Sequence, residues 1–194
     1  MYLDHAATTP ISASALAALT SELSRSGNPS SLHGSGRRAR MVVEDSRETL
    51  AAALDCHPSE VIFTSGGTEG DNLAVKGLYW SRRDADPRRT RILCSPVEHH
   101  AVLDTVEWLE KHEGAVVSWL PVDSDGVVSL DAVRRELEEH GGETALLTVM
   151  WANNETGTIF PIREVAEIAK EYGAVMHTDA VQIAGKVRID VQKV

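Results

Sequence analysis

The stretch Ala145-Leu146-Leu147-Thr148-Val149-Met150 indicates the fold. A nearly continuous apolar run is typical of a strand that is buried on both faces, as in parallel sheets with helices on each side. Outward from it, apolar runs that predict strands alternate with segments of helical spacing. We therefore predict an α/β fold with a mostly parallel sheet flanked by helices. The expected strands are 61–64, 91–94, 115–122, 145–151 and 174–178, and the expected helices are 68–83, 102–112, about 130–139 and 162–172.

Two further amphipathic helices are expected before the first strand. Apolar residues recur at helical spacing over 11–24 and again over 36–54. The stretch 24–36 between them is rich in Ser, Gly, Asn and Pro, which predicts an ordered loop.

Composition restricts the class of protein. The 194 residues carry 29 acidic and 19 basic side chains, a formal net charge of −10, which disfavours nucleic acid as the main partner. Two cysteines, Cys56 and Cys94, are too few for a disulfide framework and suit a reducing compartment. The sequence shows no leader pattern, and no apolar run reaches the roughly 18 residues that span a membrane. We therefore expect a cytoplasmic protein with no membrane segment.

Residues able to do chemistry follow four of the expected strands, and ligands of parallel sheets bind at the carboxyl ends of the strands. The first such end contains Gly66-Gly67-Thr68, where a helix start offers N–H groups and a positive dipole end to an anion such as phosphate. The other interpretation is a plain helix start in which Thr68 and Asp71 imitate a capping box. The segment matches neither the dinucleotide-binding glycine pattern nor the P-loop.

The second and third strand ends carry His99 and the pair Asn153-Asn154. His99 is able to stack on a planar cofactor or to move protons near neutral pH, although a surface histidine without such a role is the more frequent case. His99 and His100 diverge as neighbours and lack a Cys or Glu ligand pattern, so we expect no metal site. Asn153-Asn154 before Thr-Gly also fits an ordinary turn.

The fourth strand end is Asp179, which closes the apolar strand 174–178. A carboxylate there is costly unless it meets a cation or a hydrogen-bond donor, and the N-cap of a following helix is the other interpretation. Together the strand ends supply what pyridoxal phosphate needs. These are N–H groups for its phosphate, a ring for stacking, donors such as Asn154 and Gln182 for its phenolic oxygen, and a carboxylate for its ring nitrogen.

Six ordered motifs resemble those of the cysteine desulfurases of the NifS/IscS type, and the resemblance covers essentially the whole chain. The motifs are Tyr2-Leu3-Asp4-His5-Ala6-Ala7-Thr8-Thr9-Pro10, Gly27-Asn28-Pro29-Ser30-Ser31, Gly66-Gly67-Thr68-Glu69, Glu98-His99, Asn153-Asn154-Glu155-Thr156-Gly157 and Asp179-Ala180-Val181-Gln182.

The resemblance implies a fold-type I enzyme that works as a homodimer with pyridoxal 5′-phosphate. Such enzymes take sulfur from L-cysteine and leave alanine and an enzyme persulfide, so a sulfur-acceptor protein or an iron–sulfur scaffold is implied as a further partner. The residues assigned by the resemblance are Gly67 and Thr68 for the phosphate, His99 for ring stacking and proton transfer, Asn154 and Gln182 for the phenolic oxygen, Asp179 for the ring nitrogen, and Asn28 near the substrate mouth. Gly70 replaces a serine that is common in the family, but Thr68 is intact.

Two residues of the family pattern are absent from this chain. The Schiff-base lysine follows the Asp-Ala-x-Gln motif, and the persulfide cysteine lies much further on, in a small C-terminal domain. Lys186 matches a different position, and neither Cys56 nor Cys94 matches the nucleophile. We therefore expect an N-terminal portion, with 1–35 as a segment and helix near the active-site mouth and 36–194 as part of the large pyridoxal-phosphate domain. The chain alone is expected to be inactive.

Three alternatives stay open at this point. The first is another fold-type I enzyme, such as a class V aminotransferase or a selenocysteine lyase. The second is a truncated module that binds a partner without catalysis. The third is a nucleotide-binding doubly wound domain, which is disfavoured because its glycine fingerprint is absent.

Overall fold

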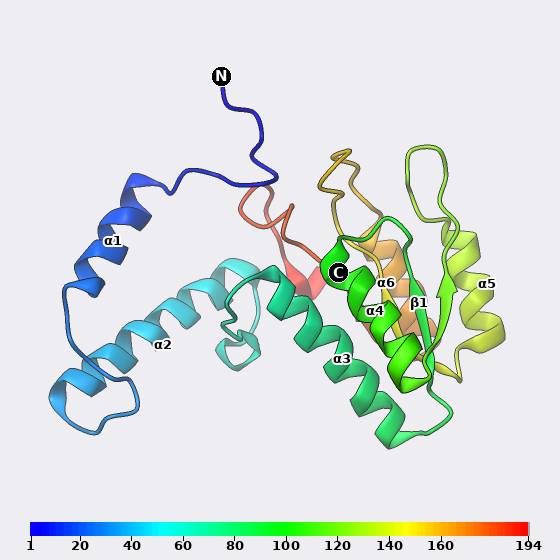
Figure 1. Cartoon of the computed structure of the whole chain (residues 1–194), viewed down its shortest axis with the longest axis horizontal. Helices are drawn as coiled ribbons and strands as arrows, with labels where there is room; N and C mark the ends of the chain where they lie inside the picture. The colour runs from blue at the N-terminus through cyan, green and yellow to red at the C-terminus, as the bar shows by residue number, and fades with distance from the viewer. Residues whose placement is uncertain (194) are drawn as a thin grey trace. The chain divides into compact units, whose positions relative to one another are not determined.

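The computed structural model describes residues 1–193 and contains two compact units. Unit 1 comprises Met1–Ile62 with Ile189–Gln192, and unit 2 comprises Phe63–Arg188 with Lys193. Figure 1 labels most of the elements. In chain order they are α1 (Ala13–Leu23), α2 (Gly34–Leu54), the 3₁₀ helix η1 (Pro58–Glu60), α3 (Gly67–Ala85), β1 (Arg91–Cys94), α4 (His100–Glu113), β2 (Val116–Trp119), α5 (Leu130–His140), β3 (Thr144–Thr148), α6 (Ile162–Glu171), β4 (Met176–His177) and the 3₁₀ helix η2 (Val191–Lys193).

Unit 2 is built on a parallel sheet with the strand order β2-β1-β3-β4. Ile92 of β1 is paired with Val117 on one side and with Leu146 on the other. Strand β3 then pairs with β4, where Leu147 lies opposite Met176. The predicted α/β fold with a mostly parallel sheet is therefore confirmed.

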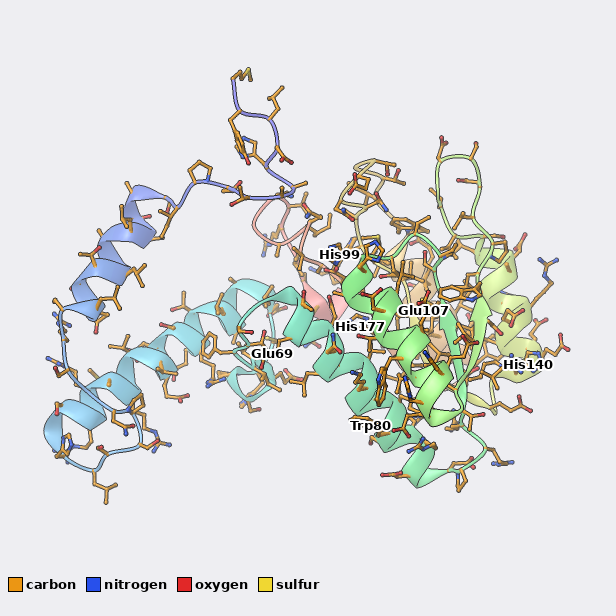
Figure 2. All side chains as sticks on the ribbon, in the orientation of Figure 1. Glu69, Trp80, His99, Glu107, His140 and His177 are labelled. Carbon is orange, nitrogen blue, oxygen red and sulfur yellow. The ribbon has the colours of Figure 1, made fainter. Side chains whose placement is uncertain are left out.

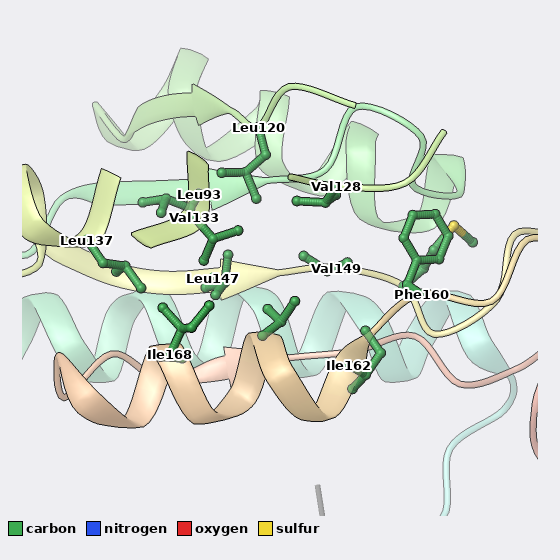
Figure 3. Close-up of a cluster of buried hydrophobic side chains, with 13 residues drawn as sticks. Leu93, Leu120, Val128, Val133, Leu137, Leu147, Val149, Phe160, Ile162 and Ile168 are labelled. Atoms are coloured by element: carbon green, nitrogen blue, oxygen red, sulfur yellow. The ribbon is translucent and has the colours of Figure 1, made fainter. Parts of the chain in front are cut away.

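Helices cover both faces of this sheet. One core contains side chains of β1, β3, α5 and α6, among them Leu93, Leu147, Val133 and Ile168 (Figure 3). The other core contains alternate residues of the same strands, such as Ile92 and Leu146, packed with α3 and α4. Residues that alternate along a strand point to opposite faces. The apolar run that predicted β3 therefore serves both cores.

Unit 1 contains the two helices expected from 11–24 and 36–54. The hydroxyl of Ser12 caps α1 by accepting a hydrogen bond from the N–H of Ala15 at 3.2 Å. Helix α2 ends at Asp55, whose left-handed φ of 59° stops the helical ladder. Within the described residues, no helix is long and apolar enough to cross a membrane.

The prediction of a buried strand at 61–64 is wrong. These residues have no strand assignment, and Ile62 and Phe63 are 69% and 48% exposed. A strand requires a hydrogen-bonded neighbour, whereas the carbonyl of Val61 accepts a hydrogen bond from the Arg47 guanidinium. The apolar run predicted the residue type of a strand but not the partner that a strand needs.

Three other strands are shorter than predicted. β2 ends at Trp119 and β3 at Thr148, before the predicted ends at 122 and 151, and β4 comprises only Met176–His177 of the predicted 174–178. Backbone hydrogen bonding between the chain segments of β3 and β4 continues beyond the strand ends, since the N–H of Trp151 donates to the carbonyl of Asp179 at 2.9 Å. The compact units divide at residue 62, and the division of the family fold after residue 35 stays a prediction.

Strand β3 is the core element to test. Leu147 is fully buried, whereas Leu73 on α3 is exposed. We expect Leu147→Ala to lower the free energy of unfolding by about 2–5 kcal/mol through lost burial and a residual cavity. Leu73→Ala is the matched control and should change it by less than about 0.5 kcal/mol. Urea unfolding measures both, and equal losses would contradict the placement of β3 in the core.

Candidate active site

The carboxyl edge of the sheet carries four segments that are tied to one another. The side-chain amide of Asn153, after β3, donates to the carbonyl of Val97, after β1, at 3.0 Å. Near the start of α3, a Cβ placed on Gly67 would lie 3.1 Å from a methyl group of Val181, after β4. Glycine at position 67 therefore permits a close approach of the helix start to the Asp179 loop.

Helix α3 begins without a side-chain cap. Its N-cap residue is Gly66, and the N–H of Ser65 donates to the Glu69 carboxylate at 2.7 Å. Hydrogen bonding from the Ser65 side chain, and then from its backbone N–H, holds the pKa of Glu69 below its usual range. The alternative capping box of Thr68 with Asp71 is not formed. The N–H groups at the first turn of a helix have no intrahelical acceptor and favour an anion.

His99 is the N-cap of α4 and is exposed on the surface (Figure 2). Its Nδ1 accepts the N–H of Ala101 at 3.1 Å, which fixes the ring at the helix start. An open cleft of about 280 Å³ between α3 and α4 is lined by both Thr68 and His99, together with Lys76 and other residues. The structure thus brings the predicted phosphate ligand and the predicted stacking ring to one cleft.

The two predicted amide donors have neighbours of their own. The amide nitrogen of Asn154 donates to the Glu155 carboxylate at 2.9 Å. The amide oxygen of Gln182 accepts from the Lys186 ammonium at 2.6 Å. The segment of Asn154 also forms the turn that was the other interpretation, since the carbonyl of Asn153 accepts the N–H of Gly157 at 3.0 Å.

Asp179 is buried, with 8% of its surface exposed. Its Oδ1 accepts the N–H of Val181 at 2.8 Å and caps a turn, not the helix of the alternative interpretation. Burial raises the pKa of Asp179 above its usual value, and the charge of Asp71 raises it further. The Val181 N–H and the charges of His177 and His99 act in the opposite direction.

Asp179 belongs to a group of three buried carboxyl side chains that we call the acidic cluster, Asp71, Glu98 and Asp179, and His177 lies beside them. Asp71 and Glu98 are only 7% and 6% exposed. The ring Nε2 of His177 lies 3.5 Å from the Asp71 carboxylate. The sequence analysis gave none of these three neighbours of Asp179 a part in the site, because only the fold brings α3, β4 and the loop after β1 together.

Glu98 is the most unusual member of the acidic cluster. Its Oε1 accepts the backbone N–H of Met150, but its buried Oε2 has no hydrogen-bond partner among residues 1–193. Burial raises the pKa of Glu98 to about 8, and the carboxylates of Asp179 and Asp71 contribute to the rise. Glu98 therefore carries a proton through most of the neutral range, because an ionised carboxyl at this position would be poorly solvated.

Two further positions from the sequence analysis are Asn28 and Cys94. Asn28 belongs to unit 1, where its side-chain oxygen accepts the N–H of Ser30 at 2.9 Å, and its place at a substrate mouth stays a prediction. Cys94 is buried on β1, and burial raises the pKa of its thiol, which makes it a poor nucleophile. Among residues 1–193, no group of three or more His, Cys, Asp or Glu side chains could hold a metal ion.

Glu98 should make stability depend on pH. Its folded pKa of about 8 lies above the ordinary glutamate pKa of 4.5, so the folded chain holds a proton that the unfolded chain releases between these values. Stability should therefore fall as pH rises through this window, by about 1.4 kcal/mol per pH unit at most from this one group. Glu98→Gln removes the titration, so we expect its free energy of unfolding to improve relative to the unmodified chain between pH 5 and pH 8.

Urea unfolding at several pH values measures this difference. Glu107→Gln on α4 is the matched control, because Glu107 is exposed (Figure 2) and its difference from the unmodified chain should not vary in this window. A pH-independent difference for Glu98→Gln would show that Glu98 is ionised in the folded chain.

Comparison with known proteins identifies relatives of this chain. The chain is 57% identical over 189 residues to an IscS-like cysteine desulfurase of Mycobacterium tuberculosis, covering 97% of this chain and 48% of the relative. It is 44% identical over 194 residues to a cysteine desulfurase IscS of Methanosarcina thermophila, covering 100% of this chain and 46% of the relative. The chain thus spans about half the length of the curated relatives it matches.

Solved structures give the same result. A NifS-like protein matches 100% of this chain and 52% of its own, with a TM-score of 0.88 and 36% identity. The structure described as SspA in complex with cysteine matches 99% of this chain and 54% of its own, with a TM-score of 0.90 and 34% identity. The resemblance inferred from the motifs is therefore confirmed.

A family profile covers the chain from end to end. It is the profile described as aminotransferase class-V, and it matches residues 1–194. The parallel sheet with helices on both faces agrees with the fold of the solved neighbours. On this evidence, the chain belongs to the aminotransferase class-V family.

Proposed function

We propose that this chain binds pyridoxal 5′-phosphate and forms the cofactor-binding part of a cysteine desulfurase. In this proposal the whole protein is a cytoplasmic homodimer that takes sulfur from L-cysteine and passes it to an acceptor protein or an iron–sulfur scaffold. Relatives named cysteine desulfurases support the reaction class. The observation that carries the proposal is the buried Asp179 carboxylate, whose loop closely approaches the uncapped start of α3.

Pyridoxal phosphate has an anionic end and a ring nitrogen that becomes cationic, and this edge has a complement for each. The uncapped start of α3 and the hydroxyl of Thr68 suit the phosphate. Asp179 has a pKa raised by burial and by Asp71, so a cation beside it would lower the free energy of its ionised form. The chain's residues therefore fit the group at both ends.

Each predicted residue then has a separate task. When bound, pyridoxal phosphate supplies a ring that withdraws electrons from the substrate linked to it. Asp179 holds the ring nitrogen protonated, because its carboxylate pairs with the cation in a partly desolvated site. His99, fixed by its cap bond to Ala101, stacks on the ring and exchanges protons through Nε2. Thr68 and the helix N–H groups hold the phosphate.

Asn154 and Gln182 supply amide hydrogens to the phenolic oxygen in this proposal, and both side chains have other partners in the structure. The Asn154 amide now donates to Glu155, an exposed side chain, so it would exchange a solvent-exposed partner for a ligand. Gln182 accepts from Lys186 through its oxygen, and the donors of its amide group are the N–H bonds on its nitrogen.

Binding of pyridoxal phosphate by this chain tests the proposal. We expect Asp179→Asn to weaken binding and to abolish its preference for pyridoxal phosphate over an analogue with carbon in place of the ring nitrogen. Thr68→Ala should weaken both ligands alike, by about tenfold, because it removes one charge-assisted hydrogen bond to the phosphate. Tryptophan fluorescence and ³¹P NMR give the two dissociation constants.

Asp84→Asn is the matched control, because Asp84 is exposed near the far end of α3. It should bind both ligands as the unmodified chain does. If Asp179→Asn keeps the full preference for the ring nitrogen, Asp179 does not hold that nitrogen and the assignment of the site is wrong.

The isolated chain should lack desulfurase activity. The family's Schiff-base lysine and persulfide cysteine have no counterpart among its residues, so neither a covalent link to the cofactor nor a sulfur acceptor is available. Release of sulfide and alanine from L-cysteine is the measurement, with free pyridoxal phosphate as the background. Release above that background by chain free of longer homologues would refute this expectation.

A further inference from the structure

His177 connects three elements inside unit 2. Its Nδ1 is hydrogen-bonded to the hydroxyl of Thr148 on β3 at 2.9 Å, and its Nε2 faces the carboxylate of Asp71 on α3 at 3.5 Å. The side chains of His177 and Asp71 are 10% and 9% exposed. Asp179 follows two residues after His177 on the same strand end. The ring therefore occupies a buried position with one polar partner on each nitrogen.

The surroundings of His177 are rich in negative charge. Asp71 faces it from α3, Glu98 belongs to the loop after β1, and Asp179 follows on its own segment. Glu98 holds a proton in the neutral range, with a pKa of about 8. His99, the N-cap residue of α4, also acts on Asp179 through its charge. Of these two histidines, His177 has the less exposed side chain.

The partners of His177 tolerate a change in its charge. A threonine hydroxyl either donates to a neutral ring nitrogen or accepts from a protonated one. The Thr148 contact is therefore compatible with either charge of the ring, and the Asp71 carboxylate lies 3.5 Å from its Nε2. A positive charge on His177 favours the ionised form of Asp179.

We propose that His177, held between Thr148 and Asp71, is a positioning residue that supplies positive charge to the acidic cluster and keeps Asp179 ionised for a cationic ring nitrogen. The proposal rests on the proposed function for the identity of that ligand. It makes the Asp71–His177 pair part of the electrostatics of the site. A packing role alone would require only that the ring fill its space between β3 and α3.

The titration of Asp179 in the chain without cofactor separates these two roles. His177→Gln keeps a polar side chain but removes the ring charge. We expect the pKa of Asp179, followed by ¹³C NMR of labelled aspartate carboxyls, to rise by about one unit, a tenfold change in its ionisation constant. A loss of packing alone would leave it unchanged. An unchanged or lowered pKa of Asp179 in a folded variant overturns the proposal.

His140→Gln is the matched histidine control. His140 ends α5, and its carbonyl accepts the hydroxyl of Thr144 at the opposite edge of the sheet (Figure 2). This variant should leave the pKa of Asp179 unchanged. A rise equal to that of His177→Gln would show that general loss of positive charge, not the position of His177, is responsible.

Asp71→Asn is the second variant and decides the matter if His177→Gln does not fold. Repulsion between carboxylates alone predicts that this change lowers the pKa of Asp179, because Asp71 raises it directly. The proposal predicts no fall, because His177 loses the partner that compensates its charge and so acts less on Asp179. A clear fall would overturn the proposal, whereas a constant or raised value supports it.

Binding of pyridoxal phosphate distinguishes failure of this inference from failure of the proposed function. Between pH 5 and pH 8, the pH at which binding of pyridoxal phosphate is half-maximal should move upward by about one unit in His177→Gln. The analogue without a ring nitrogen should show no such movement, and it controls for titration of the phosphate. If the unmodified chain binds neither ligand, the proposed function fails while the Asp179 titration still decides the role of His177. If pyridoxal phosphate binds with an unmoved midpoint, the proposed function stands and this inference is overturned.

Discussion

Strand β3 is the element on which the rest of unit 2 depends, because it is hydrogen-bonded along both edges and buried on both faces. It pairs with β1 and β4, and its residues 144–148 are all buried. The paired strands run parallel, so their carboxyl ends meet at one edge. Asn153 and Asp179 then extend this contact beyond the strands, through bonds to Val97 and Trp151. The geometry of the candidate site therefore follows from the placement of one strand.

Charge at this edge is arranged differently from charge on the surface. Three carboxyl groups, those of Asp71, Glu98 and Asp179, are each less than 10% exposed. Burying carboxylates together is costly unless some are protonated or meet cations. Glu98 meets this requirement by holding a proton, as its raised pKa of about 8 indicates. Asp71 faces the ring Nε2 of His177 at 3.5 Å. For Asp179, the charges of His177 and His99 favour the ionised form, and in the proposed function a cationic ring nitrogen does the same.

The sequence was sufficient for the order of strands and helices in unit 2 and for the ends at which polar residues gather. Apolar runs and helical spacing depend on local patterns, so α3 to α6 and β1 to β4 were predictable. The segment 61–64 was not, because a strand exists only with a paired neighbour. Asp71, His177 and Glu98 were missed for a related reason. Each is an ordinary polar residue in its local sequence, and only packing makes it a buried neighbour of Asp179.

The position of Asp179 between opposing charges has a consequence for affinity. A ligand with a protonated ring nitrogen binds the ionised form of Asp179, so the free energy needed to ionise that carboxyl is subtracted from the binding free energy. Asp71 increases this cost by repulsion, and His177 and His99 reduce it. In the proposal above, Asp71 is also the partner of a positively charged His177, so its repulsion comes with a compensating charge. A buried acid paired with a histidine can therefore stand near Asp179 at a lower net cost than an unpaired acid would.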